Sequence, residues 1–372
     1  MIKTKKLPKA DRYIIWLVLG LLVVGLLSLS SASSVLSYQR FHNNYYYFLR
    51  QLLFGALPGL ILMYVLSRID YHKWQKFAPF LVLLGIGMLV AVLIPGIGFK
   101  VGNARRWINF GSFLFQPAEF VKLVMILYLA SWYDKRQHRV EDLYYGFLPS
   151  LAIVGVVVAL IVLEPDIGTM LVLASIAAVM FFIGGVRMRY IYATAASALL
   201  VLWILIKAAP YRAERFLSFL NPSADVKGIS YQITQALLAI GSGGIWGVGF
   251  GQSRQKYSYL PEPMGDSIFA IMAEEMGFIR ICIILLLFLL LAYRGFKIAR
   301  TAPDTFGKLV AAGITCWLSL QALINIGGIT GLIPLTGIPL TFISYGSTSL
   351  LISLASLGIL LNISRFSNLT AE

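Results

Sequence analysis

The sequence predicts an all-α integral membrane protein with about ten transmembrane helices. The first observation is composition, because 59% of the 372 residues are hydrophobic and only 13% are charged. Soluble domains usually carry about a quarter charged residues. The second observation is spacing, because apolar runs repeatedly approach the ~20 residues that a helix needs to cross ~30 Å of hydrocarbon.

The predicted spans follow one another along the whole chain. The first follows a Lys-rich start and is too long to be the apolar core of a cleavable signal. Cys282 and Cys316 lie inside apolar runs, so we expect small buried side chains and neither a disulfide framework nor a metal motif. We see no repeat or linker and expect one domain over residues 1–372. The predicted spans are 13–36, 46–66, 77–95, 117–133, 146–163, 167–183, 190–209, 267–292, 306–329 and 341–364.

The distribution of positive charge predicts the orientation. Lys and Arg are more frequent in the N-terminal segment and in loops 68–76, 134–142, 185–189 and 294–308 than on the other side. Cytoplasmic loops carry this excess, so we expect both termini in the cytoplasm. The same rule accounts for most of the net charge of +15, and we expect no nucleic acid partner.

One long extracytoplasmic loop, at about 210–266, precedes the eighth span. Loops of this length are usually functional or disordered. This loop is rich in aromatic residues and has an apolar helical stretch around Ile229–Ile240. We therefore predict a partly ordered, partly membrane-embedded segment packed on the helices, because irregular backbone at that depth must be buried in protein or line a cavity.

Glu119 and Lys122 lie where the fourth span begins. Pro117 favours the first helical turn, and Glu119 in that turn suits the positive end of the helix dipole. Lys122 stands three residues later and can pair with Glu119. One interpretation is a self-satisfied pair that stabilises the helix start. The other is function, because ionisable groups within a span are costly and tend to be functional.

Other carboxylates mark the outer ends of later spans. Asp166 is in the tight link before the sixth span and is either the N-cap of that helix or a functional group, and Glu164 is expected at the interface. Asp266 ends the long loop and has the same two interpretations. Glu274 and Glu275 follow, roughly 12 Å further along the helix, and structural ion pairing, with Arg280 as a plausible counter-charge, is our preferred interpretation.

Cations are predicted on the same outer face. Arg105 and Arg106 precede Trp107, and they either anchor the chain at the interface or bind phosphate through their guanidinium groups. The Gly-rich segment 240–251 lacks the spacing of a nucleotide-binding loop. Together with the carboxylates, these cations predict an outward-facing site for a lipid-linked phosphate.

Several blocks of the sequence resemble the SEDS family of bacterial cell-wall polymerases, which includes FtsW, RodA and SpoVE. The likeness runs from the first span to the last, and the segment GFGQSRQKYSYLPE resembles FtsW more than RodA. Many relatives have Thr-Asp-Phe where this chain has Gly265-Asp266-Ser267, and the usual SYGG is here Ser344 to Ser347. The blocks are GNARRWINFGSFLFQPAEFVKL, EPDIGT, YQITQALLAIGSGGIWGVGFGQSRQKYSYLPEP, DSIFAIMAEEMGF and GIPLTFISYGSTSL.

The resemblance implies a peptidoglycan glycosyltransferase in the bacterial cytoplasmic membrane, acting on lipid II and the nascent glycan strand in cell division or cell-shape wall synthesis. It implies that Asp266 is the essential carboxylate, as the general base, and that Glu119, Lys122 and Asp166 belong to the same outer cavity. Arg105, Arg106 and Lys122 are candidates to stabilise the diphosphate leaving group. We identify no cofactor, although a divalent cation could share that role.

The resemblance also implies partners. The family usually works with a class B penicillin-binding protein, a transpeptidase, and with other membrane proteins of the divisome or elongasome. Two alternatives to the enzyme remain: a flippase that moves lipid II across the membrane, and a non-catalytic divisome scaffold. A flippase needs a polar path through the bilayer, whereas the ionisable residues of this chain concentrate in the outer halves of the spans, which favours the enzyme.

Overall fold

The structure is a computed structural model that describes residues 10–101, 104–111, 113–208, 219, 229–257 and 259–367. Each predicted span falls on a helix. The largest differences are that α11 continues to Thr301 and α13 begins only at Ser347. The helices are α1 (Arg12–Phe41), α2 (Tyr46–Gln51), η1 (Leu52–Ala56), α3 (Leu57–Leu66), α4 (His72–Leu93), α5 (Pro117–Lys135), η2 (Gln137–Arg139), η3 (Leu143–Phe147), α6 (Leu148–Leu163), α7 (Ile167–Ile183), α8 (Met188–Ala208), α10 (Ile229–Gly243), α11 (Ile268–Thr301), α12 (Thr305–Ile329) and α13 (Ser347–Phe366).

The protein is an all-α integral membrane protein. In the described part of the chain, 8 helices or helical runs are long and apolar enough to cross a membrane. The apolar helix α7 is shorter, and α5 has charged residues at both ends. With α5 and α7 these helices account for every predicted span, while the number that cross the bilayer and the side of the termini remain predictions.

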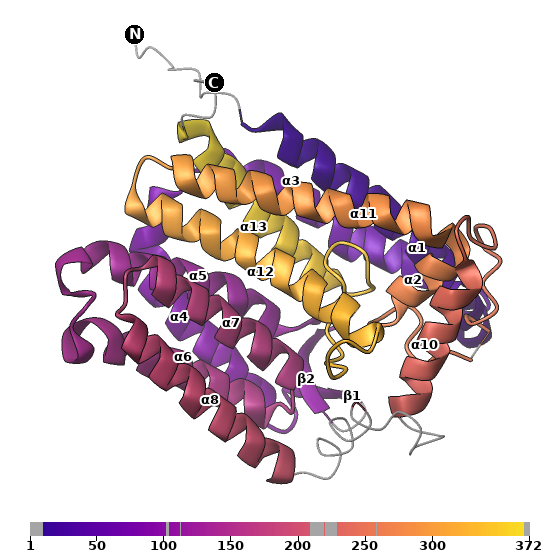
Figure 1. Cartoon of the computed structure of the whole chain (residues 1–372), viewed down its shortest axis with the longest axis horizontal. Coiled ribbons are helices and arrows are strands. Elements are labelled where there is room, and N and C mark those ends of the chain that lie inside the picture. Colours follow the sequence, from indigo (N-terminus) through magenta and orange to yellow (C-terminus); the bar gives the residue numbers. More distant parts are fainter. Residues whose placement is uncertain are drawn as a thin grey trace.

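The helices form one bundle in which α12 and α13 are central (Figure 1). On one side α11 lies between α12 and α1, and α3 packs on α13; on the other side α5 and α7 pack on α12. The contact of α3 with α13 is close, because a Cβ added at Gly358 would lie 2.6 Å from the carbonyl oxygen of Met63. Small residues allow such close backbone approach between membrane helices.

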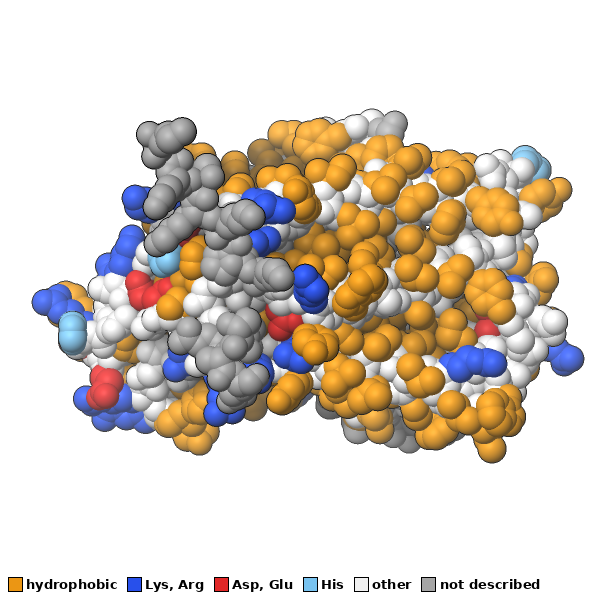
Figure 2. Space-filling view, turned by 90° about the horizontal axis from the view of Figure 1, so that it is seen from above, with side chains coloured by type: hydrophobic (Ala, Val, Ile, Leu, Met, Phe, Trp, Pro, Cys, Tyr) orange, Lys and Arg blue, Asp and Glu red, His pale blue; other side chains and the backbone are white. Residues whose placement is uncertain are grey.

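One end of the bundle joins segments that are far apart in sequence. The backbone N–H of Asp11 donates to Ser364 Oγ at 3.0 Å. Asn362 accepts from the backbone N–H of Tyr71 and donates to the carbonyl of Ser67. The start of α1, the α3–α4 link and the end of α13 therefore lie together, at the end predicted to be cytoplasmic. In Figure 2 charged side chains gather at the left end of the molecule, and mostly hydrophobic side chains cover the rest of this face.

The opposite end holds a small sheet that the sequence did not predict. Strands β1 (Gly98–Val101), β2 (Ala104–Phe110) and β3 (Phe113–Phe115) form an antiparallel sheet in the order β1-β2-β3. Arg105 and Arg106 are on β2, at a β-bulge opposite Phe99 and Lys100 of β1.

The long loop contains the predicted helix, α10, which packs against α11. Beyond α10, residues 244–249 run beside a break in α11, where Gly277 has φ 79° and ψ 175°. Val248 N–H donates to the carbonyl of Glu274 at 3.0 Å, and Phe278 N–H donates to the carbonyl of Gly244 at 2.9 Å. The loop segment thus satisfies backbone groups that the break removes from the helix.

Candidate active site

Asp266 lies at the junction of the long loop with α11. Its carboxylate Oδ1 accepts a hydrogen bond from Gln232 Nε2 of α10 at 3.2 Å. Its backbone carbonyl accepts from Asn325 Nδ2 of α12 at 3.0 Å. The N-cap of α11 is Ser267. The capping interpretation of Asp266 is not supported, because Ser267 stands at the N-cap of α11, and the half-buried Asp266 side chain contacts α10.

Glu119 and Lys122 form the predicted pair, deep in the protein. Lys122 Nζ lies 2.8 Å from Glu119 Oε1, and both side chains are only 2% exposed. Lys122 Nζ also donates to Gln321 Oε1 at 2.8 Å and lies 5.0 Å from the centre of the Trp317 ring. Since Glu119 Oε2 is buried without a hydrogen-bond partner in the described part of the chain, the pair is not fully self-satisfied.

Two amides on α12 connect this pair to Asp266, and the sequence analysis missed both. Gln321 Nε2 donates to the carbonyl of Pro339 at 3.1 Å, and Asn325 Nδ2 donates to the carbonyl of Ile338 at 2.8 Å as well as to that of Asp266. Because the two amides are four residues apart, they lie on one face of the helix. The signal that could have found them is an amide pair at this spacing inside an otherwise apolar span.

Asp166 caps α7 and also binds a cation. Its Oδ1 accepts from the backbone N–H of Thr169 at 3.0 Å, and its Oδ2 lies 3.7 Å from Arg106 Nη1. Arg106 donates to the carbonyls of Glu164 and Pro165 as well, so β2 is fastened to the α6–α7 link. Its side chain keeps 26% exposure. Both interpretations of Asp166 are therefore compatible with its position.

Arg105 is not part of this contact. Its backbone partner on β1 is Lys100. Among the described residues, no ion pair joins it to a carboxylate of the site. The structure therefore brings only Arg106 of the two arginines to Asp166.

Glu164 is fully buried, so the expectation that it lies at the interface was wrong. Neither carboxyl oxygen has a hydrogen-bond partner in the described structure. The pKa of Glu164 is raised to about 8, mainly by burial and then by the charge of Asp166, against a lowering by the charge of Arg106. Glu164 is therefore mostly protonated at neutral pH, which avoids a bare buried charge.

Glu274 and Glu275 form structural contacts, but with different partners from those expected. Lys256 Nζ lies 3.3 Å from Glu275 Oε1, and Ser31 Oγ of α1 donates to the same oxygen at 2.7 Å. Glu274 Oε1 accepts from the backbone N–H of Arg254 at 3.0 Å. Arg280 instead donates to the carbonyls of Trp246 and Met276. The counter-charge thus comes from the long loop, which sequence spacing alone does not indicate.

The arrangement places a partly accessible carboxylate, Asp266, beside a buried polar network that ends at the Glu119–Lys122 pair. A carboxylate in that position can accept a proton from a hydroxyl group that hydrogen-bonds to it. Arg106 adds positive charge near the α6–α7 link. Among the described residues, no group of three or more His, Cys, Asp or Glu is arranged as a metal site.

Comparison with known proteins identifies the family. A family model described as "Cell cycle protein" and named for FtsW, RodA and SpoVE matches residues 12–369. The chain belongs to the FtsW/RodA/SpoVE family. Stage V sporulation protein E of Bacillus subtilis is 43% identical over 364 residues, which is 98% of this chain and 99% of that protein. A probable peptidoglycan glycosyltransferase FtsW of Trichlorobacter lovleyi is 41% identical, covering 97% of this chain and 95% of that protein.

Solved structures of the FtsW/RodA/SpoVE family have the same fold. The rod shape determining protein RodA of Thermus thermophilus superimposes with a TM-score of 0.71 at 27% identity, covering 96% of this chain and 98% of that chain. A chain of a peptidoglycan synthase complex, in a study of how polymerization and crosslinking are coordinated, gives a TM-score of 0.79 at 27% identity with the same coverage.

Proposed function

We propose that this chain is a peptidoglycan glycosyltransferase that polymerises lipid II on the outer face of the cytoplasmic membrane. The observation that carries the proposal is the half-buried Asp266 carboxylate, held by α10 and α12 at the outer end of the bundle. Relatives about 40% identical over nearly the whole chain are named probable peptidoglycan glycosyltransferases, which supports the same activity here.

In the proposed reaction, the 4-hydroxyl of the acceptor sugar attacks the anomeric carbon of the lipid-linked donor. Asp266 accepts the hydroxyl proton as the new C–O bond forms. The bond between the anomeric carbon and the diphosphate oxygen breaks, and the lipid diphosphate leaves with the electron pair. Diphosphate is a good leaving group, so it needs positive charge more than a proton.

Arg106 is the best-placed cation for that leaving group. It keeps 26% exposure, whereas Lys122 is 2% exposed and already contacts Glu119 and Gln321. We therefore assign Lys122 and Glu119 to positioning: they hold α12 and the segment before α13, which contact the loop of Asp266. Asp166 orients Arg106 in this scheme, and Arg105 contributes only long-range charge.

The lipid chain of the substrate has a suitable place beside this site. A cavity of about 310 Å³ lies between α7, α8, α12 and the segment after α12, and its lining is almost entirely apolar. It begins at Ile167, next to Asp166. An apolar channel at that position suits a polyprenyl tail whose diphosphate stays among the polar groups of the outer end.

A class B penicillin-binding protein is the proposed partner, with other divisome or elongasome proteins. The similar chain from a peptidoglycan synthase complex supports this expectation, since that complex couples polymerization with crosslinking. Affinity purification from native membranes is expected to recover the transpeptidase. Repeated recovery of the chain without any transpeptidase would count against the partner.

The flippase alternative has less support. Glu274 and Glu275 are the carboxylates deepest in α11, and a flippase would need them to face a polar path. They instead contact Ser31 of α1 and Ser253 and Lys256 of the long loop, so these contacts join α1 and the loop to α11. A scrambling assay with fluorescent lipid II in vesicles separates the two activities.

Asp266→Asn tests the enzyme. The purified chain with its partner and lipid II should form glycan polymer on a gel, and Asp266→Asn should reduce the rate by about 10²-fold or more, the usual effect of losing a general base. Glu262→Gln is the matched control, because Glu262 is an exposed carboxylate of the same loop. Equal polymer from wild type and a folded Asp266→Asn would remove Asp266 from the mechanism.

A further inference from the structure

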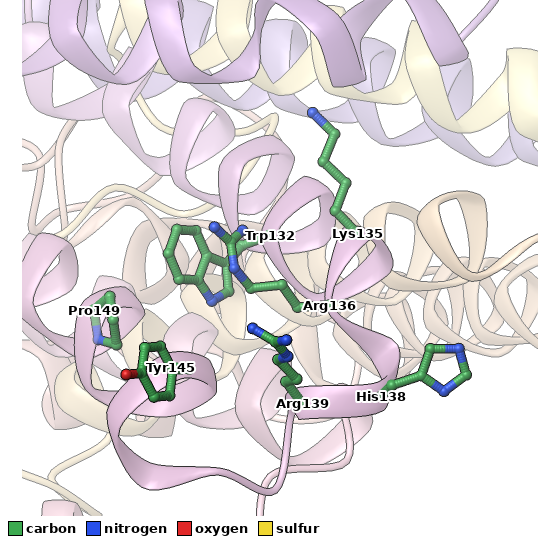
Figure 3. A pocket seen from close by; sticks show the side chains of 7 residues that line it. All are labelled: Trp132, Lys135, Arg136, His138, Arg139, Tyr145 and Pro149. Carbon is green, nitrogen blue, oxygen red and sulfur yellow. The ribbon is translucent and has the colours of Figure 1, made fainter.

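A basic cavity lies at the end of the bundle opposite to the candidate active site. Its volume is about 590 Å³, and it opens between the end of α5, η2, η3 and the start of α6. Figure 3 shows the 7 side chains that line it. They are Trp132, Lys135, Arg136, His138, Arg139, Tyr145 and Pro149.

The positive charge of this cavity is not neutralised within the described structure, where no ion pair involves Lys135, Arg136 or Arg139. The neighbouring carboxylates have other partners. Asp134 accepts from Gln75 Nε2 at 2.6 Å, and Glu141 pairs with Arg187 Nε at 2.9 Å.

Asp142 is also engaged elsewhere, because its Oδ1 accepts from the backbone N–H of Tyr144 at 2.8 Å and caps η3. Like charges held together without counter-ions repel, so a bound anion would lower the energy of this cluster.

The two arginines are arranged for an oxyanion. The guanidinium carbon of Arg136 lies 3.5 Å from the centre of the Trp132 ring, which fixes its plane. In Figure 3 the Arg136 and Arg139 side chains extend toward the part of the cavity lined by Trp132 and Tyr145, whereas His138 points away. Planar guanidinium groups bind the oxygens of phosphate or carboxylate through two parallel hydrogen bonds, and the cavity has two such groups in its lining.

The surroundings are those of a membrane interface. Trp132 Nε1 donates to the carbonyl of Gly146 at 2.8 Å, which holds η3 against α5. Tyr144 and Tyr145 are 71% and 65% exposed, and Leu148 of α6 is exposed beside them. Aromatic residues favour the level of the lipid headgroups, and an apolar surface next to them suits acyl chains. The basic cavity therefore combines phosphate-binding groups with a path for lipid.

We propose that the basic cavity binds the headgroup phosphate of an anionic phospholipid from the inner leaflet. The headgroup would contact Arg136 and Arg139, with Lys135 adding positive charge at the rim. Basic pockets between membrane helices on the cytoplasmic side bind such headgroups in this way. The site is separate from the proposed glycosyl transfer, because it lies at the other end of α5 from Glu119 and Lys122.

Native mass spectrometry of the purified full chain tests the proposal. Phosphatidylglycerol, phosphatidylcholine with the same acyl chains, and inorganic phosphate are titrated separately. Wild type should bind phosphatidylglycerol at least about tenfold more tightly than the double variant Arg136→Gln/Arg139→Gln, as expected when two cations near an anionic headgroup are removed. Phosphatidylcholine should bind both proteins weakly and equally.

The matched control is Arg300→Gln/Lys308→Gln. It removes the same charge from exposed positions at the same end of the bundle, on α11 and α12, and should leave the affinity for phosphatidylglycerol unchanged. If the double variant Arg136→Gln/Arg139→Gln fails to fold, the single variant Arg139→Gln, at an exposed residue, should still weaken the binding of phosphatidylglycerol. The proposal would be overturned if both double variants lost the same affinity for phosphatidylglycerol, or if wild type bound phosphatidylcholine as tightly as phosphatidylglycerol. It would also be overturned if millimolar inorganic phosphate displaced the lipid.

Discussion

Asp166 and Asp266 stand at equivalent places in the sequence, just before α7 and α11, yet the structure uses them differently. Asp166 accepts from the backbone of Thr169 and so caps its helix. Asp266 accepts from Gln232 of α10 instead, and Ser267 occupies the N-cap position. The Asp166 carboxylate thus contacts the start of its own helix, whereas the Asp266 carboxylate contacts a neighbouring helix.

Glu164 predicts a pH effect on stability at the residue scale. Its pKa is about 8 in the folded protein and 4.5 in its ordinary state, so the folded protein binds the extra proton between these values. The free energy of unfolding should therefore fall as pH rises from about 4.5 to about 8.

Glu164→Gln should remove this dependence and raise the thermal midpoint at pH 8 relative to wild type, measured in detergent from pH 5 to 9. Glu262→Gln, at an exposed position, is the control and should keep the wild-type slope. Parallel curves for wild type and Glu164→Gln would contradict the raised pKa.

At the scale of elements, the break in α11 explains why a long loop can sit against the bundle. Gly277 has φ 79°, a left-handed backbone conformation that favours glycine. The freed backbone groups pair with residues 244–249, and Lys256 brings its charge to Glu275 next to the break. The loop and α11 therefore stabilise each other.

Gly277→Ala should weaken this joint. A Cβ there would lie 2.2 Å from Gly247 N, and the backbone angle is unfavourable for alanine. We expect a loss of about 2 kcal/mol or more in stability, seen as a lower thermal midpoint. Gly87→Ala on α4 is the control, since no atom lies within 4 Å of its added Cβ, and it should be neutral or slightly stabilising. Equal midpoints for the two variants would show that the break bears no strain.

At the scale of the whole molecule, α12 links the parts that sequence motifs indicated separately. On one face of α12, Gln321 accepts from Lys122 and Asn325 donates to the carbonyl of Asp266. The same two amides donate to the carbonyls of Pro339 and Ile338. The segment before α13 is thus fixed between α5 and the loop of Asp266. A substitution near Lys122 and Gln321 is therefore expected to affect the position of Asp266.

Gln321→Leu tests that link. It removes an acceptor from Lys122 Nζ and from Trp317 Nε1, both buried, and each lost hydrogen bond in such a place costs about 1–3 kcal/mol. We expect a lower thermal midpoint and reduced glycan polymerisation, although Gln321 does not touch Asp266. Leu323→Ala, on the same helix at 62% exposure, is the control and should change neither. Full activity in Gln321→Leu would mean that the network does not position Asp266.

The sequence by itself determined where the helices lie along the chain. Helix positions agreed because each span must satisfy its own backbone hydrogen bonds in lipid, so apolar length and local signals such as Pro117 suffice. The pairing of Glu119 with Lys122 was predictable for the same local reason, since three residues separate them on one helix.

Only the tertiary structure decided which groups meet across the chain. Asp266 contacts Gln232 and Asn325, and Glu275 pairs with Lys256, although these partners are distant in sequence. Arg106 rather than Arg105 reaches Asp166 because of a sheet that no helical pattern indicates. The burial of Glu164 likewise depends on how its neighbours pack. Such contacts are set by how helices and loops pack, and packing depends on the shape of every neighbour at once.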